Sequence, residues 1–372
     1  MINRNKFSSF LCFLYVAIYI SGQAVGSELL ISLSIVTGIV TYLSTFEIKE
    51  RDIIIWLFLI FFIAFILQIN KTYPFSRLVF NLAFISTNIL LLSSFLKGRL
   101  NVVIILNSVI YFLVLSVLVA FIISMLHHVP VYTYLDSVLV GFSYNYISGL
   151  LILTVTLYLA YYSLVNVAPR HGKSISLITF LLCCLLYGRS GIAFSILLVV
   201  ISFRDYLNVK NGFRSFLIMI FLVLLALFIL YNSFVIVDLI QHSKFKEGIQ
   251  SPRFMMLDQY LDSLDMKTFI LGVDITKIPL IASFNFNPHN SYLNLHAMLG
   301  IVGVALMSLV IVLIFSLFLR DFIVACYLLI YLGRGALDTI IFPGVLDFVF
   351  LGILIGGPYL VKHYNISRCL KC

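Results

Sequence analysis

Apolar residues recur in long runs along almost the whole chain, and polar residues interrupt them at short intervals. A run of 18 or more apolar residues is long enough to cross the roughly 30 Å hydrocarbon core of a bilayer as an α-helix. The pattern therefore predicts an all-α polytopic membrane protein. We expect twelve spans, over residues 7–22, 28–46, 53–69, 78–96, 101–126, 146–166, 174–188, 190–203, 215–236, 291–319, 322–333 and 345–361.

Composition points the same way. Of the 372 residues, 62% are hydrophobic and only 10% are charged, whereas a soluble domain has about 25% charged residues. So few charged side chains cannot cover the surface of a soluble protein of this size. This balance excludes a soluble enzyme, a disordered chain and a secreted disulfide scaffold.

The net charge of +9 follows from topology and requires no nucleic-acid partner. Cytoplasmic loops of membrane proteins carry an excess of Lys and Arg. We expect the N-terminus in the cytoplasm, since two basic residues precede the first span, and twelve alternating spans return the C-terminus to the same side. On this count 15 of the 24 basic residues face the cytoplasm, namely Arg4, Lys6, Lys49, Arg51, Lys97, Arg99, Arg170, Lys173, Arg204, Lys210, Arg214, Arg320, Lys362, Arg368 and Lys371. The segment Ala24-Val25-Gly26 is also a passable signal-peptide cleavage site, although we expect an uncleaved first span.

This count divides the chain into three parts. Residues 1–236 hold the first nine spans, residues 237–290 form one long outward loop, and residues 291–372 hold the last three spans and a cytoplasmic tail. The loop is nearly neutral and contains no cysteine, so no disulfide orders it.

The middle of the loop predicts an amphipathic helix. Ser251 suits the N-cap, and Pro252 is tolerated at the first helical position. One face is apolar, with Leu257, Tyr260, Leu261 and Leu264, and the other is acidic, with Asp258, Asp262 and Asp265. Such a helix lies on the bilayer surface or caps the transmembrane body. Arg253 falls on the apolar side and needs a partner, either a structural carboxylate or a phosphate group.

The loop ends at a second helix start. Asn287 suits an N-cap and Pro288 the first helical position, so we expect His289 and Asn290 in the first turn. The positive end of a helix favours anions and disfavours imidazolium, which keeps His289 neutral and able to accept a proton. The alternative is a histidine that only hydrogen-bonds at the interface. His296, seven residues further on, shares roughly the same face but is buried deeper, and we expect it to be structural.

An arginine interrupts the apolar stretch 174–203. This stretch is too long for one span and short for two, so we expect a hairpin of two short helices, with Arg189 at its outward tip or sunk slightly below it. An arginine in this position costs roughly 2.5–3.5 kcal/mol on insertion scales, and such residues usually serve a site. Arg334 and Asp338, four residues apart in the last outward connection, form either a helix ion pair or a substrate contact.

Cysteine usage gives no strong signal for chemistry. Cys369 and Cys372 form a CxxC pair at the end of the chain, but no second pair or histidine accompanies it. We read the spacing as incidental and predict neither a metal site nor a cofactor.

The order and context of Arg189, Arg253 and His289 resemble the lipid-linked glycan polymerases and ligases, a superfamily that includes O-antigen polymerase and O-antigen ligase. Members have about a dozen spans and a long periplasmic loop late in the chain. They share a serine/arginine/glycine turn between two spans, an arginine in the loop helix and a histidine–asparagine motif that runs into glycines. The matching segments are Gly188-Arg189-Ser190-Gly191, Arg253, Gly272, Pro288-His289-Asn290-Ser291-Tyr292-Leu293 and Gly300-Ile301-Val302-Gly303.

Two departures accompany this resemblance. Arginine precedes serine here, where the family more often has serine first. Met298 stands where ligases and many relatives have Glu or Thr, which favours a polymerase over a ligase.

The resemblance implies metal-independent glycosyl transfer at the periplasmic face of the bacterial inner membrane. The donor is then a growing polysaccharide on undecaprenyl diphosphate, and the acceptor is a repeat unit on the same carrier. Arg189 and Arg253 would bind the diphosphate, and His289 would act as general base. The candidate substrate-binding residues are Asn290, Tyr292, Arg334 and Asp338. The family also suggests a chain-length regulator as a partner.

Two other functions stay open. A ligase would use the same donor and the same three residues but would transfer the polymer to the lipid A core. A flippase-like carrier of lipid-linked sugar also fits twelve spans with both ends inside. Transporters, however, usually place a long loop between similar halves and hold acidic groups in mid-membrane. Here we find no internal repeat, and all fifteen Asp and Glu fall near span ends or in loops.

Overall fold

The computed structural model describes residues 4–47, 50–70, 73–140, 143–167, 169, 171–203, 252–284 and 286–357, and the regular structure in these ranges is helical. Six helices are long and apolar enough to cross a membrane: α1 (Arg4–Val25), α2 (Glu28–Thr45), α4 (Phe75–Leu96), α5 (Val102–Leu126), α7 (Tyr144–Leu164) and α17 (Ile301–Arg320). Shorter apolar helices are Ile53–Gln68 within α3 (Glu50–Ile69), α8 (Gly172–Leu185), α9 (Arg189–Ser202), α18 (Phe322–Gly335) and Asp347–Gly357. This is the architecture of a multi-pass membrane protein.

The helices coincide with the predicted segments, with two qualifications. The predicted span 215–236 lies outside the described residues, as do Ser251 and the CxxC pair. The predicted span 291–319 is wrong as a single helix, because it breaks at Gly300 into α16 (Ser291–Leu299) and α17. Gly300 has φ 55°, and a Cβ there would lie 2.1 Å from the Ile270 carbonyl oxygen. Glycine therefore lets the chain turn where the loop backbone packs against it.

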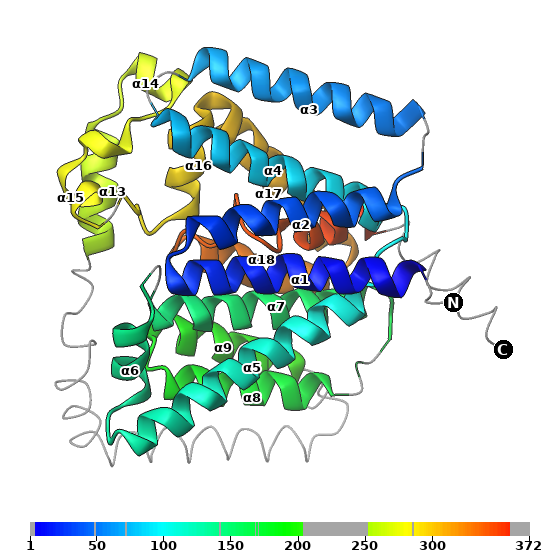
Figure 1. Ribbon diagram of the computed structural model, residues 1–372, viewed down its shortest axis with the longest axis vertical. Coiled ribbons are helices and arrows are strands. Elements are labelled where there is room, and N and C mark those ends of the chain that lie inside the picture. Colours follow the sequence, from blue (N-terminus) through cyan, green and yellow to red (C-terminus); the bar gives the residue numbers. More distant parts are fainter. Residues whose placement is uncertain are drawn as a thin grey trace.

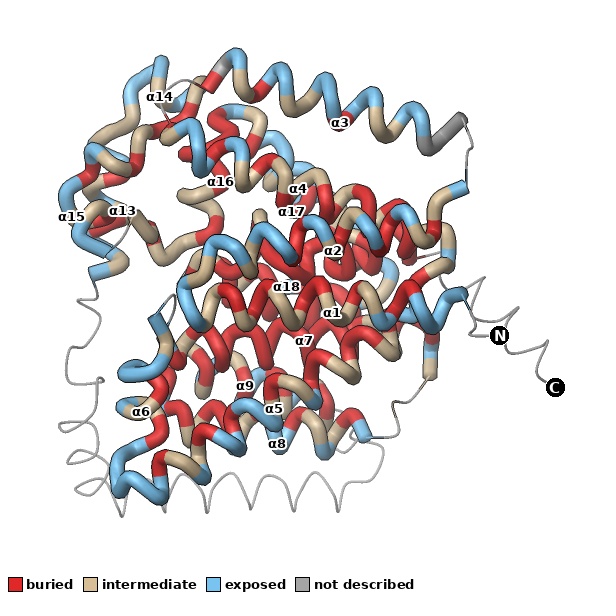
Figure 2. The backbone as a smooth tube through the Cα atoms, viewed as in Figure 1, coloured by how far each residue is buried: buried red, intermediate tan, exposed pale blue. Residues whose placement is uncertain are grey.

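The helices run side by side as a bundle with α7 at its centre (Figure 1). Nearly every residue of α7 is buried, because α5, α8, α9 and α18 pack around it (Figure 2). Outer helices instead expose large apolar side chains such as Phe61 on α3, Ile122 on α5 and Phe315 on α17. An apolar outer surface around an apolar core is typical of helices surrounded by lipid.

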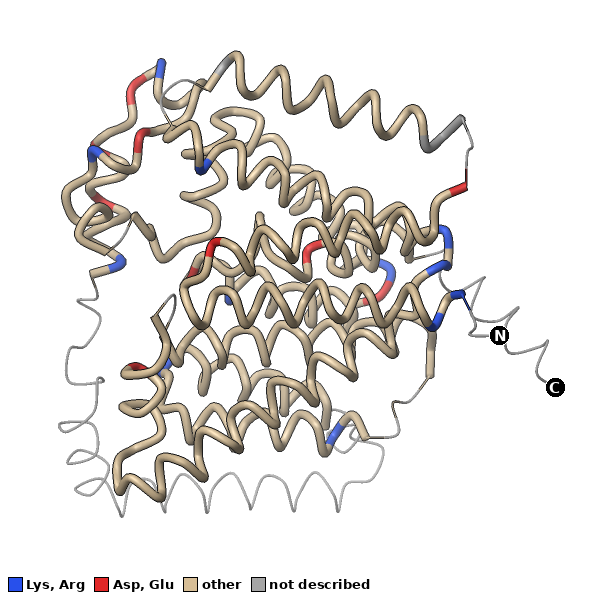
Figure 3. Tube along the Cα trace, in the orientation of Figure 1, with Lys and Arg blue, Asp and Glu red and all other residues tan. Residues whose placement is uncertain are grey.

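The two ends of the bundle differ. At the end where α1 begins, Arg4 donates a hydrogen bond to the Ser44 carbonyl (2.9 Å), and Arg99 pairs with Glu47 at 2.5 Å. The opposite end carries the short helix α6 (Val131–Val138), which the sequence did not predict, and the loop helices that follow residue 251 (Figure 1). Basic residues lie at both ends, and the end at which α1 begins holds a group of them (Figure 3).

Candidate functional site

Residues 252–284 form a cap of short helices over one end of the bundle. They are α13 (Pro252–Asp262), α14 (Met266–Leu271), the 3-10 turn η2 (Ile275–Lys277) and α15 (Pro279–Ser283). The predicted helix is present over Pro252–Asp262 and its acidic face is exposed, while the predicted N-cap, Ser251, lies outside the described residues. Leu261 was expected on the buried face but is 52% exposed, and Met256 is buried instead. The buried face is rotated because α13 packs against α15 as part of the cap.

His296 fastens the cap to α16. Its Nδ1 shares a 2.6 Å hydrogen bond with the Tyr260 hydroxyl, and its Nε2 lies 3.0 Å from the Phe269 carbonyl oxygen. Both ring nitrogens are thus engaged with the loop, which is the structural role expected for His296. Gly272 lets the backbone of the cap pack directly against α16. Its φ is 97°, and a Cβ there would lie 2.2 Å from the Ala297 carbonyl oxygen.

A pocket of about 690 Å³ opens beneath this cap, and we call it the arginine pocket. Its volume is that of a typical small-molecule site. Arg189, Arg253 and His289, which are far apart in the sequence, all line it. The remaining lining residues are Ser143, Tyr144, Asn145, Tyr187, Ser190, Pro252, Phe254, Leu257, Phe284, Asn290, Ala336 and Leu337.

Helix N-termini converge on the arginine pocket. Its lining includes the first residues of α7, α9 and α13 and the N-cap of α16. A helix N-terminus carries a partial positive charge and free amide donors. The Asn290 side chain already caps two amides of α16, and Pro252 has no amide hydrogen, so these two ends contribute chiefly through their partial charge. Together with two guanidinium groups, the four ends favour an anion over a cation in this pocket.

Small residues allow α9 to bring Arg189 to the pocket. A Cβ at Gly188 would lie 2.5 Å from Asn145 Oδ1, and one at Gly191 would lie 2.9 Å from Ser148 Oγ. Both contacts are with α7, so the two glycines permit α9 to begin directly against the central helix. Arg189 is the first residue of α9 and forms the tip of the hairpin with α8, as predicted.

Arg253 is half-buried at the start of α13. Burial is the main cause that lowers the pKa of Arg253 below its ordinary value, and the positive charges of Arg334 and Arg189 lower it further. The negative charge of Asp338 acts in the opposite direction and raises this pKa. The guanidinium nevertheless remains protonated at neutral pH, because the ordinary pKa of arginine is so high. The mutual repulsion of three arginines would be relieved by a bound anion.

The predicted position of His289 in a first helical turn is wrong. The helix begins at Ser291, and Asn290 is the N-cap whose Oδ1 accepts hydrogen bonds from the Tyr292 and Leu293 amides. Both Asn287 and Asn290 are residue types that can cap a helix. Asn287 instead accepts a hydrogen bond at its Oδ1 from the backbone amide of His289, at 2.8 Å. His289 is left at φ 47°, a region that few residues other than glycine adopt.

Asp338 lies behind His289. Its Oδ1 is 3.6 Å from His289 Nδ1, and its Oδ2 is 3.5 Å from Nη2 of Arg334. Burial raises the pKa of Asp338, but the contact with His289 and the charge of Arg334 outweigh it and hold that pKa below its usual value. The carboxylate is therefore charged at neutral pH. It faces the imidazole at a distance longer than a hydrogen bond, and His289 Nδ1 is buried without a hydrogen-bond partner among the described residues.

Arg334 and Tyr292 point away from the arginine pocket. Arg334 is 0% exposed, and Nη2 donates to the Asn145 carbonyl at 2.8 Å. The Tyr292 hydroxyl donates to the Leu332 carbonyl at 2.5 Å. Of the four residues expected to bind substrate, only Asn290 lines this pocket, and the i,i+4 ion pair of Arg334 with Asp338 is present.

Ser291, which the sequence analysis did not single out, holds the site together. Its hydroxyl donates to the Asp338 carbonyl at 2.7 Å and accepts the amides of Ile340 and Ile341. It is fully buried and so locks the connection after α18 against the start of α16. Its position directly after the histidine–asparagine pair was the available signal.

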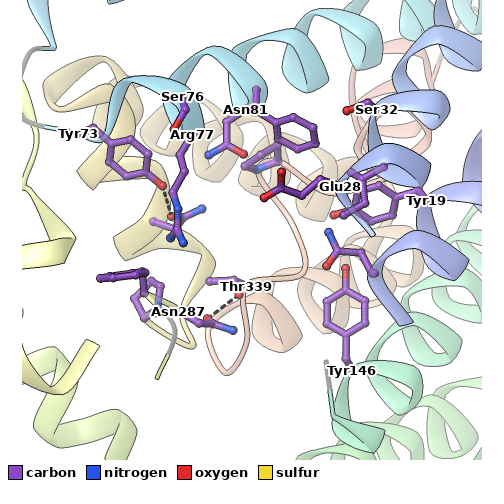
Figure 4. A pocket seen from close by; sticks show the side chains of 17 residues that line it. Tyr19, Glu28, Ser32, Tyr73, Ser76, Arg77, Asn81, Tyr146, Asn287 and Thr339 are labelled. Carbon is purple, nitrogen blue, oxygen red and sulfur yellow. Dashed lines mark hydrogen bonds between the residues drawn. The ribbon is translucent and has the colours of Figure 1, made fainter. Parts of the chain in front are cut away.

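A second pocket of about 530 Å³ lies next to the first, and we call it the polar pocket (Figure 4). Glu28 from α2 and Arg77 from α4 extend into it, and the Arg77 guanidinium also lies 4.6 Å from the centre of the Phe286 ring. The sequence analysis named neither residue. The other lining residues are Tyr19, Gln23, Ile31, Ser32, Tyr73, Ser76, Phe80, Asn81, Tyr146, Asn287, Pro288, Asn294, Thr339 and Pro343.

No family model, no curated protein and no solved structure matches this chain.

Proposed function

We propose that this protein is a membrane glycosyltransferase that polymerises oligosaccharide repeat units carried on undecaprenyl diphosphate. The observation that carries the proposal is the arginine pocket, where two arginines, a histidine and four helix N-termini meet. A diphosphate that joins a sugar to a lipid carries two negative charges and gains a third as it leaves the glycosyl carbon, and fixed positive charge stabilises the charge that develops on it. Guanidinium groups suit this role because they bind phosphate oxygens in pairs.

In this proposal the transfer is a single displacement. The acceptor hydroxyl oxygen attacks the anomeric carbon of the donor sugar, and the bond from that carbon to the diphosphate breaks. The electron pair leaves with the diphosphate, which Arg189 and Arg253 hold. The hydroxyl proton passes to His289 as general base, and Asp338 stabilises the imidazolium that forms.

The proposed orientation has twelve spans, both termini in the cytoplasm and the arginine pocket at the periplasmic face of the bacterial inner membrane. The basic residues at the end where α1 begins support this orientation, because cytoplasmic ends carry excess Lys and Arg (Figure 3). Arg189 and Arg253 at the other end belong to the pocket instead.

Purified full-length protein in detergent, supplied with one synthetic lipid-diphosphate repeat unit and EDTA, tests the proposal. We expect a ladder of lipid-linked oligomers on a gel with no other protein present. The His289→Ala protein at matched concentration should give none. A wild-type protein that leaves the matching repeat unit unchanged would contradict the proposal.

The same assay separates the other functions. Transfer that appears only when lipid A core is added identifies a ligase, since the donor and the pocket are shared. Movement of the lipid-linked sugar across a vesicle membrane without any new glycosidic bond identifies a carrier.

A further inference from the structure

The polar pocket has a lining unlike that of the arginine pocket. Amides and hydroxyls dominate it, and these groups both donate and accept hydrogen bonds. One cation, Arg77, is offset by one anion, Glu28, within the same lining. Two pairs of lining groups already bond to each other, Tyr73 with Asn294 at 3.3 Å and Thr339 with Asn287 at 2.7 Å (Figure 4).

This lining selects a ligand class. An acyl chain would leave the polar groups without partners, which is costly. A dianionic diphosphate would meet Glu28, and a single arginine would have to balance both charges. A ligand with several hydroxyl groups uses the donors and acceptors together, and the half-buried side chains of Phe80 and Phe286, which line the pocket, can pack on its carbon–hydrogen face.

The two pockets share their walls at three places in the chain. On α7, Asn145 lines the arginine pocket and Tyr146 the polar pocket. After α18, Leu337 lines the first pocket and Thr339 the second. The third place is the strained loop before α16, whose residues Asn287 and Pro288 face the polar pocket while His289 and Asn290 face the arginine pocket.

We infer that the polar pocket binds sugar residues of the lipid-linked glycan, next to the carbon that reacts at His289. The inference rests on the proposed function for the identity of the glycan. Proximity is its physical basis, because transfer requires the sugar and the leaving diphosphate to be held side by side in fixed geometry. The sugars belong either to the incoming repeat unit or to the growing chain, and both present the same hydroxyl-rich surface.

Two substitutions test the pocket with little risk to folding, since both side chains are exposed. Ser32→Trp fills the pocket from α2, and Arg77→Gln removes its cation. The matched control for the first is Ser116→Trp at an exposed position on the outer side of α5, and the control for the second is Lys267→Gln in α14. Arg253→Gln serves as the reciprocal variant in the arginine pocket.

The measurement is binding to the full-length protein in detergent, by isothermal titration, of two probes. One is the free repeat-unit oligosaccharide without lipid or phosphate, and the other is undecaprenyl diphosphate without sugar. We expect Ser32→Trp and Arg77→Gln to weaken oligosaccharide binding at least about tenfold and to leave undecaprenyl diphosphate binding within about twofold, which corresponds to less than about 0.5 kcal/mol. Arg253→Gln should show the reverse.

The inference is overturned if both polar-pocket variants bind the oligosaccharide as tightly as the wild type does. It is also overturned if Ser116→Trp weakens oligosaccharide binding as much as Ser32→Trp does, or if the wild type does not bind the oligosaccharide at millimolar concentration. Any of these results together with an intact polymer ladder leaves the proposed function standing. Loss of oligosaccharide binding in the two variants together with no ladder from the wild type sustains the sugar site and rejects the polymerase.

Kinetics with wild-type and Arg77→Gln proteins then distinguish the source of the sugars. A raised KM for the single lipid-linked repeat unit assigns the pocket to the acceptor. A raised KM for a preformed lipid-linked oligomer assigns it to the growing chain. A variant that changes neither KM contradicts the inference.

Discussion

The arginine pocket and the polar pocket lie on opposite sides of a few residues, yet they offer opposite chemistry. The arginine pocket gathers two guanidinium groups and four helix N-termini, and the Asp338 carboxylate is buried behind His289. In the polar pocket, Glu28 lies in the first turn of α2. Its negative charge offsets the partial positive charge of that helix N-terminus and the charge of Arg77.

This difference shows how one fold can offer two neighbouring pockets with different ligand preferences. Under the proposed function, the strong positive charge lies where the diphosphate is released, and the neutral hydrogen-bonding groups line the space that the sugars occupy. Variants can therefore separate the two functions.

The largest expected effect is that of His289→Ala. Loss of a general base costs about 100-fold to 10,000-fold in rate, while binding of oligosaccharide and of undecaprenyl diphosphate should change less than about threefold. His127→Ala, an exposed histidine after α5, is the control. Polymer synthesis at the wild-type rate by the His289→Ala protein would remove the histidine from the reaction.

The second-largest effect is expected for Arg253→Lys. Lysine keeps the charge but lacks the planar fork that binds two phosphate oxygens. We expect the rate of polymerisation to fall about 10-fold to 100-fold and the affinity for undecaprenyl diphosphate to fall with it, as calorimetry can measure. Lys267→Gln removes a charge from the same cap without entering either pocket and should leave both quantities unchanged.

Asp338→Asn should have a smaller effect, about 10-fold on rate, because a neutral amide stabilises the imidazolium that forms less well than a carboxylate. The lowered pKa of Asp338 also predicts that the stability of the protein depends on pH. A carboxyl whose pKa is lowered on folding stabilises the protein above its unfolded pKa, about 3.9, and that stability is lost as pH falls through the folded value. Thermal unfolding of wild type and Asp338→Asn should therefore differ at pH 7 and converge at a pH below about 4. A constant difference down to acid pH would contradict the ionised pair.

The smallest effect belongs to Tyr260→Phe, which removes the hydroxyl bonded to His296. One such hydrogen bond contributes about 0.5–1.5 kcal/mol to stability. Because the bond anchors the cap that carries Arg253, binding of undecaprenyl diphosphate should weaken slightly and binding of oligosaccharide should not. Equal losses at both pockets would show that the cap supports the polar pocket as well.

Much of the bundle was predictable because bilayer thickness sets the length of an apolar run, and the described helices begin and end within a few residues of the predicted ones. The break at Gly300 was not, since it depends on the Ile270 backbone that packs there. Local rules likewise could not choose between Asn287 and Asn290 as the helix cap.

The candidate site shows the same division. Arg189, Arg253 and His289 each stood out singly, because charge or a helix start in an apolar context is conspicuous. The contact of Asp338 with His289 joins segments 49 residues apart (338 − 289) and has no spacing signal. The polar pocket was invisible for the same reason, since its side chains come from α1, α2, α4, α7 and α16.

The short hairpin of α8 and α9 has a consequence for the membrane itself. Each helix has 14 residues and so reaches about 21 Å, less than the roughly 30 Å of hydrocarbon in a typical bilayer. Lipid beside the hairpin must thin, or water must descend, to meet Arg189 at its tip. The headgroup layer then dips toward the guanidinium. Under the proposed function, a carrier's diphosphate would reach Arg189 without leaving the leaflet, and membrane thickness would influence the rate of transfer.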